Sequence, residues 1–271
     1  VVCLYGIIAS MMQNDGGAVL AAYDPQVSSG LVFGMSMVVA SFALGGVISA
    51  DYCRFAKSRA DVVKSSILGV IPAGLFMLLT GALMSIVTGQ YDISAILASL
   101  GVPLFGLIAL VLATWTTNVT NAYSGGLALS NLLGFDESRF KITTGIAGGI
   151  GTLLAAFGLL NAFQGFLSLM SALIPPLAGV IIAGYWVVGR GRLDRFQRRE
   201  GFSAPGVIAF LAGAVLACIT GGTFASFPAL LAAAPWLNIP FFVGPVNGIV
   251  VSLVLYMVLD KLMPAPAPAE A

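Results

Sequence analysis

The sequence predicts an all-α integral membrane protein, and its composition, its hydropathy and the placement of its charges each indicate that class. Of the 271 residues, 59% are hydrophobic and 8% are charged, and the mean hydropathy is +1.01. Soluble domains carry about 25% charged residues, so the composition excludes the soluble class.

Seven windows of roughly 20 apolar residues, the length of a membrane-spanning helix, follow one another along the chain. Residues 1–12 read as the end of one more, truncated span, because Val1 is no initiator Met and no cationic signal-peptide segment follows it. We therefore interpret the chain as a fragment with a partial span and seven whole ones, at 31–52, 65–89, 102–130, 142–160, 165–188, 205–223 and 239–259.

The basic residues support the same span count and give an orientation. All twelve Lys and Arg residues lie in alternate connections or after the last span. Cationic loops stay on the cytoplasmic side, so we expect a cytoplasmic C-terminus. This bias accounts for the basic residues without a nucleic-acid partner. The connections that carry no Lys or Arg are 13–30, 90–101, 161–164 and 224–238.

Glycine and proline interrupt two of the predicted spans. Gly45-Gly46 lies in the first whole span and Pro175-Pro176 in the fifth. Glycine lowers helix propensity and proline removes a backbone donor, so each site can expose backbone groups to a ligand. Close helix packing and a simple kink are the alternatives. The end of the chain, 261–271, has the composition of a disordered tail.

A polar stripe runs through the third whole span. At 3.6 residues per turn its members share one helix face, and such a face at membrane depth has to point toward protein or a water-filled cavity. Thr116, Thr117 and the Ala113 carbonyl can supply three oxygen ligands to a sodium ion, although a single threonine commonly bonds back to its own helix. The stripe contains Ala113, Thr116, Thr117, Thr120, Asn121 and Ser124, with Thr114 and Asn118 along its edge.

The sequence gives little support to an enzyme. It has no His, no pair of carboxylates within the spans and no nucleophile beside a base. Its three cysteines are far apart, which suggests neither a disulfide framework nor a metal site. We expect no cofactor other than a coupling sodium ion. Asp51 and Arg54, three residues apart, are predicted to pair along the helix in a structural or gating role.

Four segments together resemble the nucleobase-cation symport family, which includes the cytosine permeases. The resemblance covers about residues 28–260, and the Trp-Thr-Thr-Asn run is its most specific part. The segments are Trp115-Thr-Thr-Asn118 followed by Tyr123, Ser41-Phe42 before Gly45-Gly46, Ser49-Ala-Asp51-Tyr-Cys-Arg54-Phe, and Ile174-Pro-Pro-Leu-Ala-Gly-Val-Ile-Ile-Ala183.

The resemblance implies a transporter fold of two inverted five-helix repeats followed by two further helices. Residues 1–12 would then end the fifth helix. Residues 31–188 would form the second inverted repeat, which is the substrate and cation half, and 189–260 the two additional spans. The four helices before them would be partners from the same protein.

The resemblance also implies the site. Sodium would be held by the Ala113 carbonyl, Thr116 and Thr117 together with the first helix of the family. The nucleobase would lie between Asn118 and a broken helix that carries the residues Ser41, Phe42 and Gly45. Cytosine permeases typically have Ser and Ala where this chain has Leu44 and Gly45, and an Asp at Gly184, which leaves the exact base open.

These residues lead to a function hypothesis with rivals. The leading hypothesis is sodium-coupled import of cytosine or a related nucleobase by alternating access, in the lipid bilayer of a bacterial-type inner membrane. The alternative is a permease of the same fold for a purine, allantoin or hydantoin, with sodium or proton coupling. A receptor or assembly protein that binds without transport is the rival from another class.

Overall fold

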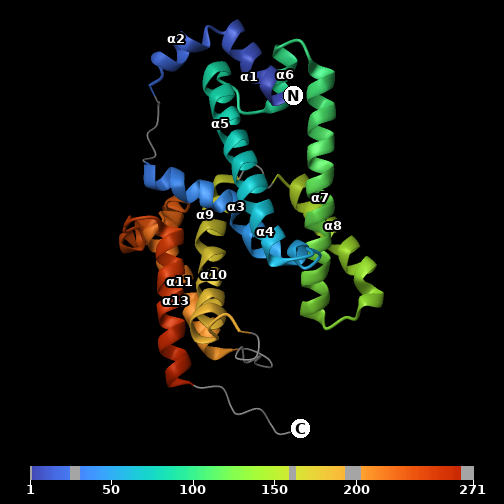
Figure 1. Ribbon diagram of the computed structural model, residues 1–271. Helices are drawn as coiled ribbons and strands as arrows, with labels where there is room; N and C mark the ends of the chain where they lie inside the picture. The colour runs from blue at the N-terminus through green and yellow to red at the C-terminus, as the bar shows by residue number, and fades with distance from the viewer. Residues whose placement is uncertain (1, 25–30, 159–162, 193–202, 264–271) are drawn as a thin grey trace. The chain divides into compact units, whose positions relative to one another are not determined.

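The computed structural model describes residues 2–24, 31–158, 163–192 and 203–263, and every regular element in these ranges is a helix (Figure 1). This confirms the all-α prediction. The elements are α1 (Val2–Gln13), α2 (Gly16–Ala21), α3 (Leu31–Cys53), α4 (Arg59–Ser65), η1 (Ser66–Val70), α5 (Ile71–Thr88), α6 (Ile93–Ser99), α7 (Pro103–Leu133), η2 (Glu137–Arg139), α8 (Phe140–Ala156), α9 (Phe163–Leu173), α10 (Pro175–Ile181), η4 (Ile182–Val188), α11 (Ala204–Thr220), η6 (Thr223–Ser226), α12 (Pro228–Ala233), η7 (Pro235–Leu237) and α13 (Gly244–Leu262).

The helices agree with a multi-pass membrane protein. Within the described ranges, five are long and apolar enough to cross a membrane, namely Leu31–Cys53, Arg59–Thr88, Pro103–Leu133, Gly165–Val188 and Gly244–Leu262. The predicted windows 142–160 and 205–223 contain shorter apolar helices of 17 residues each, α8 and α11. The count of seven whole spans and the inverted-repeat arrangement therefore stay predictions.

Parts of three predictions lie outside the described residues. They are the last two positions of the window 142–160, the basic residues Arg195, Arg198 and Arg199, and positions 264–271 of the predicted tail. The predicted tail is wrong at Lys261 and Leu262, because α13 continues to Leu262.

The predicted interruption at Gly45-Gly46 is wrong, because α3 is helical without a break from Leu31 to Cys53. Two glycines weaken a helix by about 2 kcal/mol relative to alanine. Exposing even one unpaired backbone group to an apolar medium costs several kcal/mol, so the continuous helix has the lower free energy. The Ser41 and Ser49 hydroxyls bond back to carbonyls within the helix, to Val38 at 2.8 Å and to Gly46 at 2.7 Å.

The predicted interruption at Pro175-Pro176 is confirmed. Helix α9 ends at Leu173, and α10 begins at Pro175. Neither proline has a backbone N–H, so two helical hydrogen bonds are absent at this joint. The Pro176 carbonyl accepts a hydrogen bond of 2.8 Å from the buried Ser252 hydroxyl. This hydrogen bond joins α13 to the first turn of α10, directly after the kink.

Two π-helical segments lie within the apolar stretches. The first, Ser66–Val70, directly precedes Ile71-Pro72 at the start of α5. A proline clashes with the carbonyl four residues earlier, and a wider turn relieves that clash. The second, Ile182–Val188, ends the stretch that began at Pro175. In both segments the backbone groups remain hydrogen-bonded, although the number of residues per turn changes.

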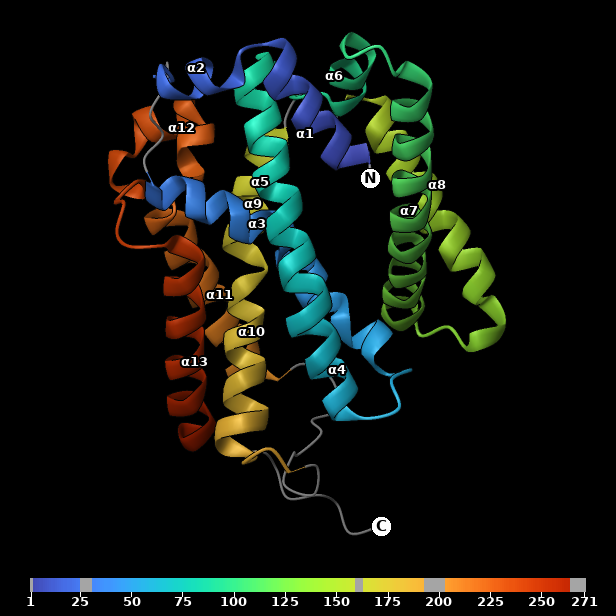
Figure 2. The ribbon, with the colours of Figure 1, turned by 45° about the horizontal axis from the view of Figure 1, so that its top comes forward.

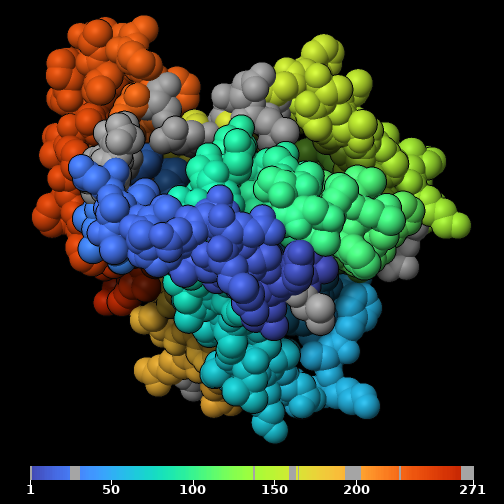
Figure 3. Space-filling model, turned by 90° about the horizontal axis from the view of Figure 1, so that it is seen from above, coloured from blue at the N-terminus to red at the C-terminus, as the bar shows by residue number. Residues whose placement is uncertain are grey.

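The described residues group into two compact units, one drawn from 1–28 and 51–154 and the other from 29–50 and 155–271. In the first unit, α1 and α2 lie against α5, α6 and the start of α7 (Figure 3). The core of this packing is a cluster of Met84, Ile96, Leu97 and Leu100. A Cβ at Gly6 would lie 2.8 Å from the Met84 Cε, so α1 approaches α5 as closely as a glycine allows.

Small residues also join α7 to α8 within the first unit. A Cβ on Gly126 would lie 2.9 Å from the Thr144 Cα, and a Cβ on Gly125 would lie 3.0 Å from the Ala147 Cβ. The Ser130 and Thr143 hydroxyls, both buried, are 2.8 Å apart. Small side chains with a polar link are typical of helix contacts in an apolar medium. This contact fixes the C-terminal third of α7.

The second unit is built around α10, α11 and α13, which lie side by side in Figures 1 and 2. Glycines set the spacing here too. A Cβ on Gly213 of α11 would lie 2.7 Å from the Gly248 carbonyl oxygen and 2.9 Å from the Ser252 Cβ. A Cβ on Gly248 would lie 2.8 Å from the Pro176 Cγ. The three helices can therefore approach one another closely at this point, because the glycines carry no Cβ.

We expect Gly213→Ala to lower the free energy of unfolding of the second unit by about 1–3 kcal/mol, because the new methyl group overpacks against the α13 backbone. The better helix propensity of alanine, about 1 kcal/mol, offsets only part of this loss. Melting in detergent, followed by intrinsic fluorescence, measures the difference. Gly206→Ala in the same helix is the matched control, because its Cβ would meet neighbours only at 3.4 Å or more. Equal melting of both variants would contradict the tight contact.

Candidate functional site

The predicted sodium ligands lie together on α7. The Thr116 Oγ1 and the Thr117 Oγ1 each donate to the Ala113 carbonyl oxygen at 3.0 Å. Thr116 also lies 3.3 Å from the Leu112 carbonyl oxygen. The side-chain oxygens thus converge on one carbonyl because of helix geometry alone. Each hydroxyl that donates its hydrogen keeps its lone pairs for an outside ligand.

These same hydrogen bonds are the ones expected of any single threonine in an apolar helix. Thr114 bonds to the Leu110 carbonyl at 2.8 Å, and Thr120 bonds to the Thr117 carbonyl at 2.8 Å. All four threonine hydroxyls of the stripe and its edge therefore have partners within α7. These bonds satisfy the threonine hydrogens in an apolar medium, and the cation site stays a prediction.

The centre of α7 is uncovered within its own unit. Ala113, Thr116, Thr117 and Asn118 are all exposed, and Trp115 on the opposite face is 70% exposed. The packing of the first unit reaches α7 at its two ends, through the α1 and α6 contacts and through α8. The middle of α7 is therefore exposed on both faces. In a chain this apolar, such a surface is available for contact with further partners.

The three predicted substrate residues of α3 belong to the second unit. Ser41 and Phe42 are exposed, with the Phe42 ring 60% accessible, and Gly45 is half-buried. A Cβ on Gly45 would meet that ring at 3.4 Å, so the ring lies next to Gly45. These residues form one local group. Because α7 belongs to the other unit, a shared site with Asn118 stays a prediction.

The last turn of α3 contacts α7 inside the first unit. The Tyr52 hydroxyl lies 3.1 Å from the Ser124 Oγ and 3.4 Å from the Thr120 carbonyl oxygen. The Arg54 Nη2 donates to the Tyr123 hydroxyl, and its guanidinium carbon lies 4.8 Å from the Phe55 ring centroid. We call these two hydrogen-bonded pairs, Tyr52–Ser124 and Arg54–Tyr123, the α3–α7 latch.

The predicted Asp51–Arg54 pair is wrong, because the Arg54 guanidinium turns to Tyr123 instead of to Asp51. The helix ends at Cys53, so Arg54 no longer follows the spacing that would bring the two charges together. Sequence reasoning missed the Tyr52–Ser124 contact. The available signal was a tyrosine in the last turn of α3, a position from which a long side chain can reach a neighbouring helix.

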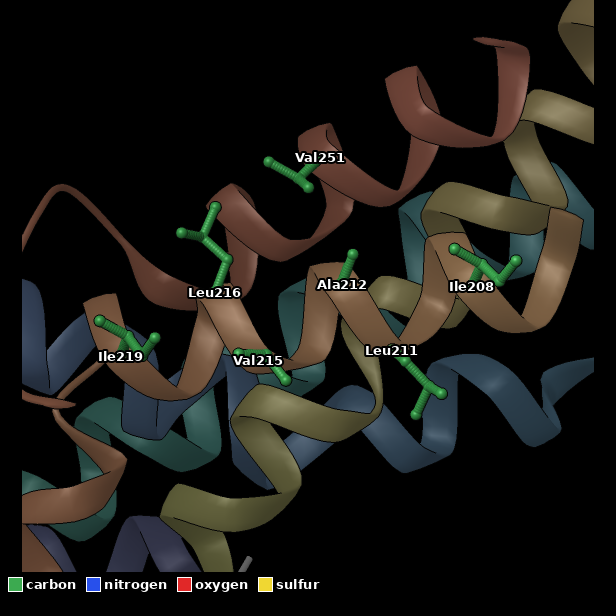
Figure 4. A pocket seen from close by; sticks show the side chains of 7 residues that line it. All are labelled: Ile208, Leu211, Ala212, Val215, Leu216, Ile219 and Val251. Carbon is green, nitrogen blue, oxygen red and sulfur yellow. The ribbon is translucent and has the colours of Figure 1, made fainter. Parts of the chain in front are cut away.

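An apolar cavity in the second unit does not fit a polar ligand. It has a volume of about 610 Å³ and lies on α11, with one residue from α13 (Figure 4). Its lining offers no charged group, hydroxyl or amide to a cation or a base. The residues are Ile208, Leu211, Ala212, Val215, Leu216, Ile219 and Val251.

Comparison with known proteins decides the family. A family model described as permease for cytosine/purines, uracil, thiamine, allantoin matches residues 2–244. The chain belongs to this permease family. It is 30% identical to the cytosine permease of Escherichia coli (strain K12) over 265 residues, which cover 97% of this chain and 58% of that relative. The resemblance inferred from the motifs is thereby confirmed.

Two other members of the permease family show its range. The chain is 25% identical over 246 residues to the allantoin permease of Bacillus subtilis, covering 79% of this chain and 46% of the relative. It is 26% identical over 147 residues to the hydantoin permease of Microbacterium maritypicum, covering 51% of this chain and 29% of the relative. All of these relatives are named permeases, which are transporters and not enzymes. The chain spans less than two thirds of the length of each.

We expect Tyr52→Phe and Ser124→Ala each to lower the free energy of unfolding by about 1 kcal/mol, because each removes the same latch hydrogen bond. The double variant should lose little more than either single one, which a double-mutant cycle in mixed micelles measures. Tyr91→Phe is the control, because Tyr91 is 93% exposed. Additive losses in the double variant would show that the two hydroxyls do not interact.

Proposed function

We propose that the complete protein imports cytosine or a related nucleobase with sodium as the coupling ion, by alternating access across a bacterial-type inner membrane. Membership of the permease family supports the coarse activity. The observation that carries the finer proposal is the convergence of the Thr116 and Thr117 hydroxyls on the Ala113 carbonyl, each at 3.0 Å.

Sodium prefers oxygen ligands, and helix backbone carbonyls beside hydroxyls are a recurring source of them in transporters. The Thr116 and Thr117 hydroxyl oxygens each already lie 3.0 Å from the Ala113 carbonyl oxygen, so we propose that little reorganisation is needed to face all three oxygens toward one ion. Asn118 follows directly on the same exposed part of α7. Its amide can both donate to and accept from the edge of a base.

The base would lie between this part of α7 and the α3 group of Ser41, Phe42 and Gly45. Phe42 is 60% exposed, and its ring can stack on a planar heterocycle. We propose residues 31–188 as the second inverted repeat and 189–260 as two additional spans. The helices that complete the first repeat would come from the rest of the protein.

Coupling follows from differential affinity. An ion gradient drives uptake only if ion binding changes the balance between outward-facing and inward-facing states, since a ligand with equal affinity for both shifts nothing. We propose that sodium favours the outward-facing state and so raises the affinity for the base. The basic connections support our proposal of a cytoplasmic C-terminus under the positive-inside rule.

A second candidate is a permease of the same family for allantoin, a hydantoin or a purine, which the names of two of the relatives favour. Leu44 stands where cytosine permeases typically have a serine, so a hydroxyl contact to the base is missing here. Competition of labelled cytosine uptake by these compounds, with and without sodium, separates the candidates. Strongest competition by allantoin or a hydantoin would replace cytosine as the substrate.

We expect Thr117→Ala in the complete gene product to raise both the sodium concentration for half-maximal uptake and the apparent KM for the base by about tenfold or more, because a ligand oxygen is lost. Uptake of labelled cytosine into cells or proteoliposomes at graded sodium measures both values. Thr114→Ala is the matched control, since its hydroxyl bonds to the Leu110 and Val111 carbonyls one turn away. Unchanged sodium dependence in the Thr117 variant would refute the site.

A further inference from the structure

A polar cavity of about 550 Å³ lies at the C-terminal end of α7 and takes no part in the site proposed above. It is a half-open cavity lined by the last turns of α7, the end of α3 and the start of α8, all within the first unit. The lining residues are Asp51, Arg54, Tyr123, Leu127, Ser130, Asn131, Phe135, Asp136 and Phe140. A planar bicyclic or monocyclic heterocycle is well within this volume.

The lining combines free hydrogen-bonding groups with ring surfaces. Within the described part of the chain, neither the Asp51 carboxylate nor the Asn131 carboxamide has a hydrogen-bond partner, whereas an Asp136 oxygen accepts from Ser138 at 2.6 Å. The Tyr123 and Phe140 rings meet edge to face, with centroids 5.4 Å apart. A carboxylate accepts only, and an amide both donates and accepts. The set suits a flat ligand with an amino group beside a ring carbonyl.

The charges of the lining favour the same class of ligand. Two carboxylates and one guanidinium face the cavity, so an N–H-bearing neutral or cationic ligand is preferred over an anion. A metal ion is disfavoured, because the described residues contain no group of three or more His, Cys, Asp or Glu that could hold one. An aminated heterocycle is therefore the ligand class that uses the lining best.

The cavity continues the polar stripe of α7. Thr117, Thr120, Ser124, Leu127 and Asn131 follow one another at helical spacings of three and four, so they share one face of the helix. Fourteen residues separate the first from the last, which is about 21 Å along the axis. The proposed cation and base site and the cavity are thus two stations on one helix face.

The α3–α7 latch lies between these two stations. Tyr52 bonds to the Ser124 Oγ and the Thr120 carbonyl, just past the threonines, and Arg54 bonds to the Tyr123 hydroxyl at the edge of the cavity. A ligand that moves along the stripe from Thr117 toward Asn131 has to pass these hydrogen bonds. The Tyr52–Ser124 pair of the latch therefore lies between the proposed primary site and the cavity, which Arg54 and Tyr123 line.

We infer that this cavity is a second, lower-affinity binding site for the transported aminated heterocycle, on the cytoplasmic side of the latch. The inference rests on the proposed function, which supplies the ligand and the orientation. In the site, the Asp51 carboxylate accepts from the exocyclic amino group, Asn131 pairs with the ring carbonyl, and the aromatic rings cover the faces. The base occupies it after the latch opens and before release.

Equilibrium dialysis of labelled cytosine against the purified complete gene product, at saturating sodium, tests this inference. The wild-type protein should bind cytosine in two classes of site, one tight and one weak. Asp51→Asn and Asn131→Leu should each weaken the second class by about tenfold, because the first replaces a charged acceptor with a neutral one and the second removes a polar contact to the base. The tight class should change less than twofold. Asp61→Asn is the matched control, because that exposed carboxylate is bonded to Ser58 and lies outside the cavity lining.

The remaining outcomes overturn one proposal or the other. A single class of site that neither variant affects removes the second site and leaves the proposed function intact. Absence of cytosine binding in the wild-type protein, with binding of another solute, removes cytosine transport itself. Loss of both classes at an unchanged melting midpoint would make the cavity the primary site. If Asp51→Asn or Asn131→Leu melts at a lower temperature than the wild-type protein, Leu127→Phe is used as the test variant instead. This change narrows the cavity and should weaken cytosine binding at the weak class of site only.

Discussion

The constraint on which this structure depends is that hydroxyl and backbone groups in an apolar medium need partners within the chain. On α7 the constraint is met locally, because each threonine hydroxyl bonds to a carbonyl one turn earlier. At the Pro175-Pro176 kink it is met from another helix, through Ser252. The first solution leaves α7 straight and its oxygens facing outward. The second joins two helices of the other unit, α10 and α13.

The positions of most helices could be predicted from the sequence, because apolar windows of about 20 residues reflect the length of a span. The positions of the breaks were harder to predict. Pro175-Pro176 breaks its helix because both prolines lack a backbone N–H. Gly45-Gly46 does not break α3, since glycine weakens a helix by less than an unpaired backbone group costs. A proline acts through bonds that cannot form, whereas a glycine only makes other conformations easier to reach.

The grouping of Ala113, Thr116 and Thr117 could also be predicted, because their spacing on one helix determines it. Contacts between helices could not. Asp51 and Arg54 have a spacing that allows pairing, but α3 ends between them and Arg54 turns to Tyr123. The Tyr52–Ser124 contact joins residues 72 positions apart, and only the packing of α3 on α7 brings them together. Local periodicity carries no information about such distances.

The π segment at Ser66–Val70 affects the direction in which the basic side chains of the preceding helix, α4, point. A π turn holds one residue more than the α turn it replaces. One residue corresponds to a rotation of about 100° around a helix axis. The bulge therefore sets the angular phase of α4, which carries Arg59 and Lys64, relative to the apolar faces of α5. A single-residue deletion in Ser66–Val70 would keep the length of the span almost unchanged and yet swing its basic side chains by more than a quarter of a circle.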